Sequence, residues 1–309
     1  MNKRLLLINL AMSNKIIIIL GPTATGKTNL ATKLAYECNG EIISADSRQV
    51  YKNLNIGTGK DLEEYNINNR KINYHLIDII DLKTNYSVYN FQRDFKKAYK
   101  SIIDKKKKTI ICGCTGLYIE SLLLEYNLSN SPPHDFDLRK KLEPQSRQEL
   151  IKYLEKINKN IIKEPKLDTK NRIIRNIEVC LNQNIKRKVS STLPIKDYKV
   201  IGINPGRDKV REGITSRLKK RLENGLIEET ENLLYKGLTH ERLNYFGLEY
   251  RFISRYLQKI YTREELFDKL NSAIHQFSKK QMTFFRRKEK RGIKINWIKN
   301  NNINLIKEI

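Results

Sequence analysis

A glycine-rich segment near the start of the chain has the residue types and spacing of a phosphate-binding loop. The pattern G-x-x-x-x-G-K-[ST] is met by Gly21, Pro22, Thr23, Ala24, Thr25, Gly26, Lys27 and Thr28. Glycines allow backbone N–H groups to converge on phosphate oxygens, and a helix beginning there adds partial positive charge. Lys27 supplies a point charge, and Thr28 supplies a hydroxyl that can bind Mg²⁺. The loop predicts a diphosphate or triphosphate site, which kinases, ATPases and other transferases share.

Asp46 is the second residue whose position suggests chemistry. It follows the segment from Glu41 to Ser44, which contains two isoleucines and which we predict to be a short parallel strand. The phosphate loop follows a mostly apolar segment from 15 to 20, which we predict to be a buried parallel strand. Because open α/β sheets place ligands at the carboxyl ends of their strands, both should open at one edge. Asp46 could accept a proton there as a general base, or it could cap the next turn.

Apolar runs and amphipathic segments alternate along the first half of the chain. We expect further strands at 75–80, 109–112 and 199–203, and helices at 26–37 and 91–103. The segment from 138 to 182 is polar and helical in pattern, and several helices are expected from 208 onward. The predicted fold is α/β, a P-loop NTPase-like parallel sheet core flanked by helices, with a smaller all-helical insertion domain. The expected bounds are 1–130 with 196–309 for the core, and 131–195 for the insertion.

The charge of the chain is strongly positive. Sixty Lys and Arg face thirty-four Asp and Glu, giving a formal net charge of +26 over 309 residues. Such a balance favours polyanionic partners, nucleic acid first and anionic membranes second. The alternative is compositional bias, since Lys, Asn and Ile all have A- and T-rich codons.

The cysteines and the hydropathy pattern indicate a cytoplasmic protein without a membrane partner. Cys38, Cys112, Cys114 and Cys180 form no C-x-x-C pair, so we expect free thiols in a reducing compartment. No stretch is long and apolar enough to span a bilayer.

Several ordered segments beyond the loop resemble the tRNA dimethylallyltransferase family. They are SADSRQVY around Asp46, IGTGK from 56 to 60, HLID from 75 to 78, TGLY from 115 to 118, NRIIRNIEV from 171 to 179, and KKQMTFFR from 279 to 286. The chain departs from the family pattern at four positions. Cys114 stands where the family usually has glycine, Gly59 and Asp61 replace its usual alanine and proline, and Phe284 replaces its tryptophan.

The resemblance implies transfer of a dimethylallyl group from dimethylallyl diphosphate to the exocyclic N6 of an adenine. That adenine is 3′-adjacent to the anticodon in tRNAs reading codons that begin with U, and diphosphate is released. By resemblance, Asp46 is the general base, Arg217 stabilises the leaving diphosphate, and Thr115 lines the passage of the adenine. The expected cofactor is Mg²⁺, the partners are tRNA and dimethylallyl diphosphate, and we expect a monomer.

The same resemblance assigns the tRNA contacts to five parts of the chain. They are Asp46, Ser47, Arg48 and Gln49; Thr115; Arg139 with Asn171, Arg172, Ile173, Ile174 and Arg175; Asn244, Tyr245, Phe246, Gly247, Leu248 and Glu249; and Lys279, Lys280, Gln281 and Arg286.

Two other functions use some of the same residues. A small-molecule or nucleotide kinase would share the phosphate loop, and it would turn over ATP rather than dimethylallyl diphosphate. A non-catalytic RNA-binding module would retain the loop without needing Lys27, Thr28 and Asp46 intact.

Overall fold

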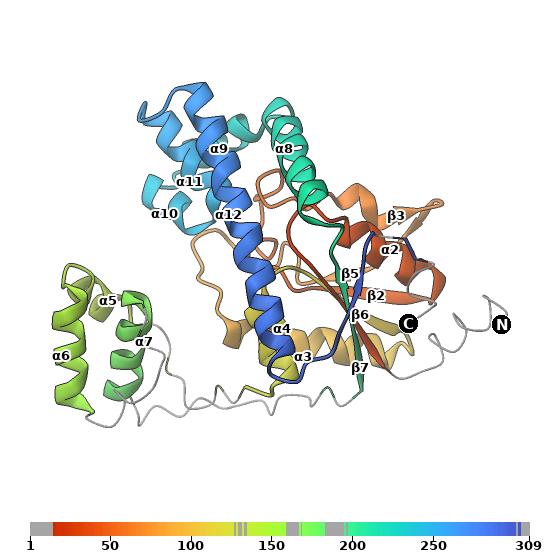
Figure 1. Cartoon of the computed structure of the whole chain (residues 1–309), viewed down its shortest axis with the longest axis horizontal. Helices are drawn as coiled ribbons and strands as arrows, with labels where there is room; N and C mark the ends of the chain where they lie inside the picture. The colour runs from red at the N-terminus through yellow and green to blue at the C-terminus, as the bar shows by residue number, and fades with distance from the viewer. Residues whose placement is uncertain are drawn as a thin grey trace. The chain divides into compact units, whose positions relative to one another are not determined.

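The chain separates into two compact units. A computed structural model describes residues 15–126, 128, 132, 135–158, 167, 169–182, 195, 197–300 and 302–303 (Figure 1). The first unit comprises residues 1–125 with 193–309, and the second comprises residues 126–192. The bounds expected from the sequence for the insertion, 131–195, differ from these by a few residues at each end.

A parallel sheet forms the centre of the first unit. The described residues give it six strands in the order β5-β2-β6-β1-β7-β8, and every pairing is parallel. The strands are β1 (Ile16–Leu20), β2 (Gly40–Ser44), β5 (Tyr74–His75), β6 (Lys108–Cys112), β7 (Tyr198–Ile203) and β8 (Ile295–Ile298). The strand that leads into the phosphate loop, β1, lies inside the sheet between β6 and β7. This is the predicted α/β architecture.

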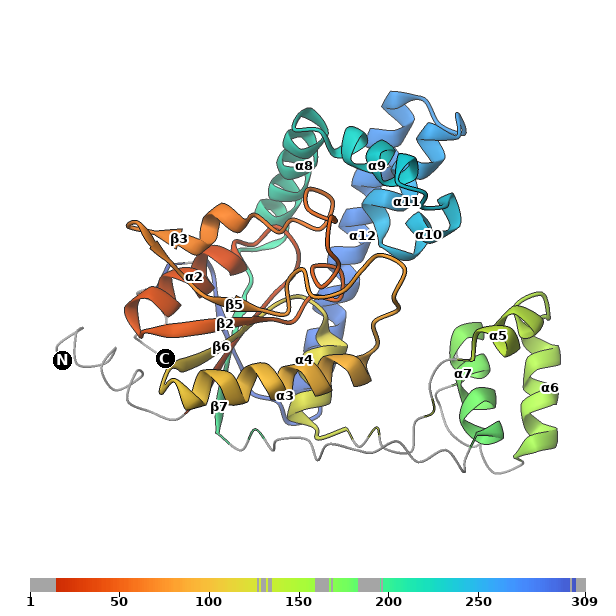
Figure 2. The same cartoon turned by 180° about the vertical axis from the view of Figure 1, so that it is seen from behind.

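Alternate residues of β1 divide the core between the two faces of the sheet, as strand geometry requires. Ile17 and Ile19 belong to the cluster that includes Leu30 and Leu34 of helix α2 (Lys27–Glu37). Ile16, Ile18 and Leu20 belong to a second cluster, with side chains from helices α3 (Val88–Asp104) and α4 (Gly116–Leu123). Figures 1 and 2 show α2 and α3 on opposite sides of the sheet. The phosphate loop is thus held between a fully buried strand and a packed helix.

The third predicted strand is mostly wrong. Only Tyr74 and His75 pair with β2, whereas residues 75–80 were expected to be extended. Leu76 and Asp78 have positive φ values of 62° and 56°, which an extended strand cannot accommodate. Between β2 and β5, the chain forms a short 3₁₀ helix (Leu62–Tyr65) and a small antiparallel pair, β3 (Asn66–Ile67) with β4 (Arg70–Lys71).

A group of helices follows β7 and packs around a separate apolar cluster. It includes Val210, Ile214, Ile253, Leu266 and Ile274. The helices of this cluster are α8 (Arg207–Glu223), α9 (Leu226–Tyr235), α11 (Leu248–Leu257) and α12 (Arg263–Glu289). The short helix α10 (His240–Tyr245) instead contributes Leu243 to the cluster that contains Ile16, Ile18 and Leu20. Helices were predicted from 208 onward, but the sheet strand β8 after α12 was missed. Among the described helices, none combines the length and the apolar character needed to cross a bilayer.

The second unit is helical in its described part. It contains α5 (Phe136–Leu142), α6 (Arg147–Ile157) and α7 (Lys170–Leu181). Leu150, Leu154, Ile173, Ile174 and Ile177 form its buried core. The apolar side chains of α6 and α7 thus account for a small hydrophobic centre belonging to this unit alone.

Candidate active site

The phosphate loop borders a cavity of about 250 Å³ at the carboxyl edge of the sheet. Residues Thr23 to Thr28 line it, while Gly21 and Pro22 do not. Gly21 is needed for packing instead, because a Cβ there would come 2.7 Å from the carbonyl oxygen of Ile203 in β7. We call this space the loop cavity.

The side chain of Lys27 hydrogen-bonds to the backbone of its own phosphate loop. Its Nζ donates a hydrogen bond of 2.6 Å to the carbonyl oxygen of Pro22. Desolvation lowers the pKa of the Lys27 ammonium below its usual range. A bound phosphate would supply the negative charge that this desolvated cation lacks.

Asp46 lies beside the loop cavity, just beyond β2, as predicted. Its Oδ1 accepts hydrogen bonds from the backbone N–H groups of Arg48 at 2.8 Å and Gln49 at 3.4 Å. Its Oδ2 accepts one from the thiol of Cys114 at 3.2 Å. The carboxylate is therefore fixed through one oxygen by the following turn, and its second oxygen contacts a thiol.

A close approach of two backbone segments brings Cys114 and Thr115 to Asp46. A Cβ on Gly113 would lie 2.3 Å from the carbonyl oxygen of Ala45, so only glycine allows this contact. Thr115 then accepts a hydrogen bond from the backbone N–H of Ser47 through its hydroxyl, at 3.0 Å. The φ of Cys114 is not positive, so a side chain there needs no backbone adjustment. Desolvation raises the pKa of the Cys114 thiol, and the charge of Asp46 raises it further.

Arg217 reaches the phosphate loop from α8. Its Nη2 donates a hydrogen bond to the hydroxyl of Thr23. The backbone N–H of Thr23 in turn donates to Oε1 of Gln281 in α12, at 3.0 Å. Desolvation and, next, the neighbouring charge of Arg221 lower the pKa of Arg217 to about 10. The loop, α8 and α12 are thus joined at one point.

A second cavity of about 560 Å³ meets the loop cavity; we call it the larger cavity. Thr23, Asp46, Thr58, Cys114 and Arg217 line both spaces. The larger cavity is lined by aromatic, apolar and cationic side chains. Among its lining residues are Arg48, Tyr245, Phe246, Arg251, Phe277, Lys280 and Phe284.

Most of the predicted tRNA-contacting residues of the first unit line this larger cavity. They are Asp46, Ser47, Arg48, Thr115, all six residues from Asn244 to Glu249, Lys280 and Gln281. Gln49 lines the loop cavity instead, and its amide is used within the protein. It accepts from Ser44 and donates to the carbonyl of Gly59, both at 3.0 Å.

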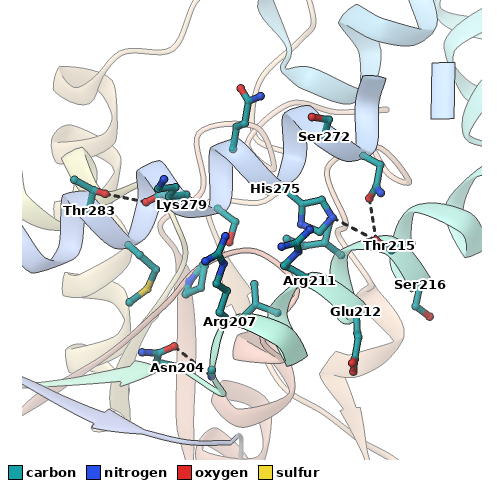
Figure 3. Close-up of a pocket in the computed structure, with 18 of the residues that line it drawn as sticks. Asn204, Arg207, Arg211, Glu212, Thr215, Ser216, Ser272, His275, Lys279 and Thr283 are labelled. Atoms are coloured by element: carbon teal, nitrogen blue, oxygen red, sulfur yellow. Dashed lines mark hydrogen bonds between the residues drawn. The ribbon is translucent and has the colours of Figure 1, made fainter. Parts of the chain in front are cut away.

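Lys279 and Arg286 lie elsewhere, because they occupy another face of α12. They line a cleft of about 1250 Å³ between α8 and α12 (Figure 3). Arg207 and Arg211 of α8 extend from the opposite wall, and Thr215 bonds His275 and Asn271 across the cleft. The residues of KKQMTFFR therefore lie on two faces of α12, one lining the larger cavity and the other lining the cleft.

The predicted contacts in the second unit fall into three groups. Asn171 and Arg172 are exposed. Arg139 and Arg175 both bind the buried carboxylate of Glu178, with nitrogen–oxygen distances of 2.5 and 2.8 Å. Ile173 and Ile174 are core residues, 0% and 1% exposed, so their side chains pack inside the unit and are not available to tRNA. Their spacing in an amphipathic helix already indicated an apolar core.

Sequence reasoning missed Phe277 and Arg221 of the larger cavity, and it noted Phe284 only as the replacement of the family's tryptophan. Phe277 and Phe284 line it, and they are two turns apart on the face of α12 that carries Lys280 and Gln281. Arg221 lines it from α8, one turn after Arg217. Helical spacing from the recognised residues could have identified all three.

The loop cavity also contains oxygen atoms suited to a hard cation. Thr28, Asp61 and Glu64 line it, and Oε2 of Glu64 is a buried atom without a hydrogen-bond partner among the described residues. Within the described part of the chain, no three His, Cys, Asp or Glu side chains form a ready metal site. The two carboxylates and the hydroxyl beside the phosphate loop are donors that suit Mg²⁺, which proteins commonly bind through one or two carboxylates together with substrate phosphates.

Comparison with known proteins agrees with this geometry. The model of the IPP transferase family matches residues 49–288, and that of isopentenyl transferases matches residues 14–80. A tRNA dimethylallyltransferase 1 of Azobacteroides pseudotrichonymphae is 47% identical, covering 96% of both chains. A tRNA dimethylallyltransferase 2 of Bacteroides fragilis is 44% identical, covering 92% of both. The crystal structure of a full-length tRNA isopentenylpyrophosphate transferase from Bacillus halodurans superposes with a TM-score of 0.68 at 29% identity, covering 96% of this chain and 95% of that one. The chain therefore belongs to the tRNA dimethylallyltransferase family.

Proposed function

We propose that this protein transfers a dimethylallyl group from dimethylallyl diphosphate to the exocyclic N6 of an adenine next to the anticodon of tRNA. The observation that carries the proposal is the position of Asp46 where the two cavities meet. One cavity has the lining of a diphosphate site, and the other has the aromatic and cationic lining that suits an unstacked base. A carboxylate between them would lie where the adenine amine meets the prenyl donor.

The two substrates would meet at Asp46 in a single displacement. The adenine N6 attacks the allylic carbon, the new C–N bond forms, and the C–O bond to diphosphate breaks. Asp46 accepts the proton that N6 loses, which increases the nucleophilicity of an otherwise poor amine. Oδ2 is the oxygen we assign to this role, because Oδ1 already accepts two backbone N–H groups.

Lys27, Arg217 and the loop N–H groups would stabilise the negative charge that grows on the departing diphosphate. Thr28, Asp61 and Glu64 would hold Mg²⁺ with the diphosphate. When bound, the ion neutralises part of the diphosphate charge. Thr115 would border the entering adenine, since it lines the larger cavity beside Asp46. We further propose that the protein acts as a cytoplasmic monomer on tRNAs reading codons that begin with U.

The test is a transfer assay with purified protein, Mg²⁺, unmodified tRNA and radiolabelled dimethylallyl diphosphate. Nuclease digestion should release prenylated adenosine from the tRNA. A parallel reaction with ATP and small-molecule acceptors should give no phosphoryl transfer. Phosphoryl transfer from ATP without any labelled tRNA would reject the proposal in favour of a kinase.

A further inference from the structure

Arg221 is a buried cation of the larger cavity that no part of the proposed reaction uses. Its side chain projects from α8, and the residue is 8% exposed. Its Nη1 lies 3.8 Å from a carboxylate oxygen of Glu249, a distance too long for a hydrogen bond. Its Nη2 has no hydrogen-bond partner among the described residues. A buried guanidinium so poorly compensated is costly unless a ligand completes its contacts.

Gly59 provides the space that this guanidinium occupies. A Cβ built on Gly59 would lie 1.9 Å from Nη2 of Arg221. The alanine that the family usually has at this position would therefore collide with the guanidinium. Glycine at 59 and arginine at 221 are structurally coupled in this chain.

Gln281 provides a second unused donor in the same cavity. It is 6% exposed, and its Oε1 already accepts from the phosphate loop. Its Nε2 is buried and has no partner among the described residues. Buried donors of this kind are rare, and each requires an acceptor. The larger cavity thus has one cationic and one neutral donor available, on α8 and α12.

We propose that Arg221 and Gln281 form a phosphate subsite in the larger cavity, in addition to the phosphate loop. The inference rests on the proposed function, because that function supplies two sources of phosphate. One is a phosphodiester of the RNA strand beside the target adenine, and the other is the diphosphate of the prenyl donor. A guanidinium suits either group, since its planar N–H donors match phosphate oxygens.

The test compares Arg221→Met with Lys220→Met, which removes an exposed charge from the same turn of α8. Met fills a similar volume, so the fold should persist; replacing a buried ion by an apolar group is often neutral for stability. Binding of unmodified tRNA and of inorganic diphosphate is measured separately at equilibrium, and KM is measured for both substrates. R221M should lower the affinity for one of the two ligands by about 10- to 100-fold, as expected for loss of a hydrogen bond to a charged group. K220M should change neither affinity by more than about two-fold, because it removes only an exposed charge.

The ligand that is weakened identifies the source of the phosphate. Weaker tRNA binding assigns the subsite to the RNA strand, and weaker diphosphate binding assigns it to the prenyl donor. Because binding is measured without turnover, the subsite can stand even if the transfer assay fails. Unchanged binding of both ligands by R221M overturns the subsite.

Gly59→Ala gives an independent check through the coupling. In the wild-type background, G59A should displace the guanidinium and reproduce the binding defect of R221M. In the R221M background, only the strain of alanine at a φ of +64° remains, so G59A should not weaken binding further. An equal loss of binding in both backgrounds would contradict the proposed coupling.

Discussion

The carboxylate of Asp46 caps a turn through one oxygen, and the other oxygen is the one to which we assign proton transfer. Through Oδ1 it caps the turn that follows β2, and through Oδ2 it faces the thiol of Cys114 where the two cavities meet. Turn capping fixes the direction of the carboxylate without using the oxygen that we assign to proton transfer. A fixed base loses less entropy in the reaction than a mobile one.

Asp46→Asn should separate these two roles. The asparagine carbonyl can still accept from the backbone of Arg48, but the amide cannot take a proton from adenine. We expect kcat to fall by about 10²- to 10⁴-fold, the usual contribution of a general base, with tRNA affinity within a few-fold. Single-turnover transfer and equilibrium tRNA binding measure the two effects. Normal transfer by D46N would remove Asp46 from its assigned role.

The thiol of Cys114 should react slowly with alkylating reagents although it lines both cavities. Its pKa is raised by desolvation and by Asp46, and only the thiolate is nucleophilic. Alkylation by iodoacetamide should therefore still be accelerating as the pH rises from about 7 to 9. Asp46→Asn removes the neighbouring negative charge, lowers the pKa of the thiol, and should speed the reaction. Peptide-resolved mass spectrometry separates Cys114 from the other three cysteines. An equal rate in D46N would show that Asp46 does not influence the thiol.

Site residues that directly follow a predicted strand could be predicted from the sequence. Site residues that are brought together only by tertiary packing could not. The loop residues and Asp46 follow predicted strands, so their common edge could be inferred. Cys114 contacts Asp46 only because Gly113 lets two backbone segments approach closely. Helical spacing places Arg221 one turn from Arg217, but no local pattern shows that it is buried rather than solvated.

At the scale of elements, the turn from Asn55 to Gly57 depends on a single carboxylate from α9. Glu229 accepts the backbone N–H groups of Asn55, Ile56 and Gly57 at 2.8 to 3.2 Å, and the hydroxyl of Tyr250 at 2.6 Å. A Cβ at Gly57 would lie 2.5 Å from the ring of Tyr250. Since Gly57 and Thr58 line the larger cavity, α9 shapes the site without entering it.

Glu229→Gln should loosen this turn, because an amide cannot accept the same four donors with both of its terminal atoms. We expect faster hydrogen exchange at the three turn amides and a loss of about 1–3 kcal/mol of stability. Glu228→Gln alters an exposed neighbour on the same helix and serves as the control. Exchange rates measured by NMR or mass spectrometry test this directly. If the three turn amides of E229Q exchange as slowly as those of the wild type, the turn does not depend on Glu229.

Helix α7 of the second unit is organised by the buried Glu178. Its carboxylate binds Arg139 of α5 and Arg175, and it also accepts the backbone N–H of Asp135. Arg139 and Arg175 therefore have a structural role, whatever they contribute to RNA binding. The sequence predicted that this segment is helical, but not that an acidic residue lies at its centre.

Glu178→Ala should leave two guanidinium groups without their buried partner. Removing one member of a buried ion pair costs about 3–5 kcal/mol, and the partial exposure of both arginines places the expected loss at the lower end. Hydrogen exchange of α5 and α7 should increase more than that of the sheet core. Glu143→Gln, at an exposed position after α5, should leave the exchange unchanged. If hydrogen exchange of α5 and α7 is the same in E178A as in the wild type, Glu178 does not organise these helices.

At the scale of the whole molecule, the sheet was easier to predict than its edges. The buried strand β1 is a continuous apolar run, β2 and β6 each contain a pair of isoleucines, and the strands alternate with helices along the chain. The strand β8 lies between basic and asparagine-rich segments, and it is identified by its pairing with β7 rather than by its own composition. Long-range pairing of this kind leaves little trace in a local sequence pattern.

The net charge of +26 should make tRNA binding strongly dependent on salt. We expect part of this dependence to come from Lys279 and Arg286, because both are exposed in the cleft beside α8 and neither side chain has an ion-pair partner in the described structure. In a K279A/R286A variant, the slope of log K against log salt concentration should fall by about one to two, as each lost phosphate contact removes about 0.7–0.9.

At saturating tRNA, kcat of K279A/R286A should be preserved, because neither side chain lines the loop cavity or the larger cavity. The matched control removes Arg263 and Lys290, two exposed cations at the ends of the same helix that line neither cavity nor the cleft. If binding were governed by total charge alone, both double variants would lower the slope equally. A larger fall for K279A/R286A would place tRNA phosphates in the cleft.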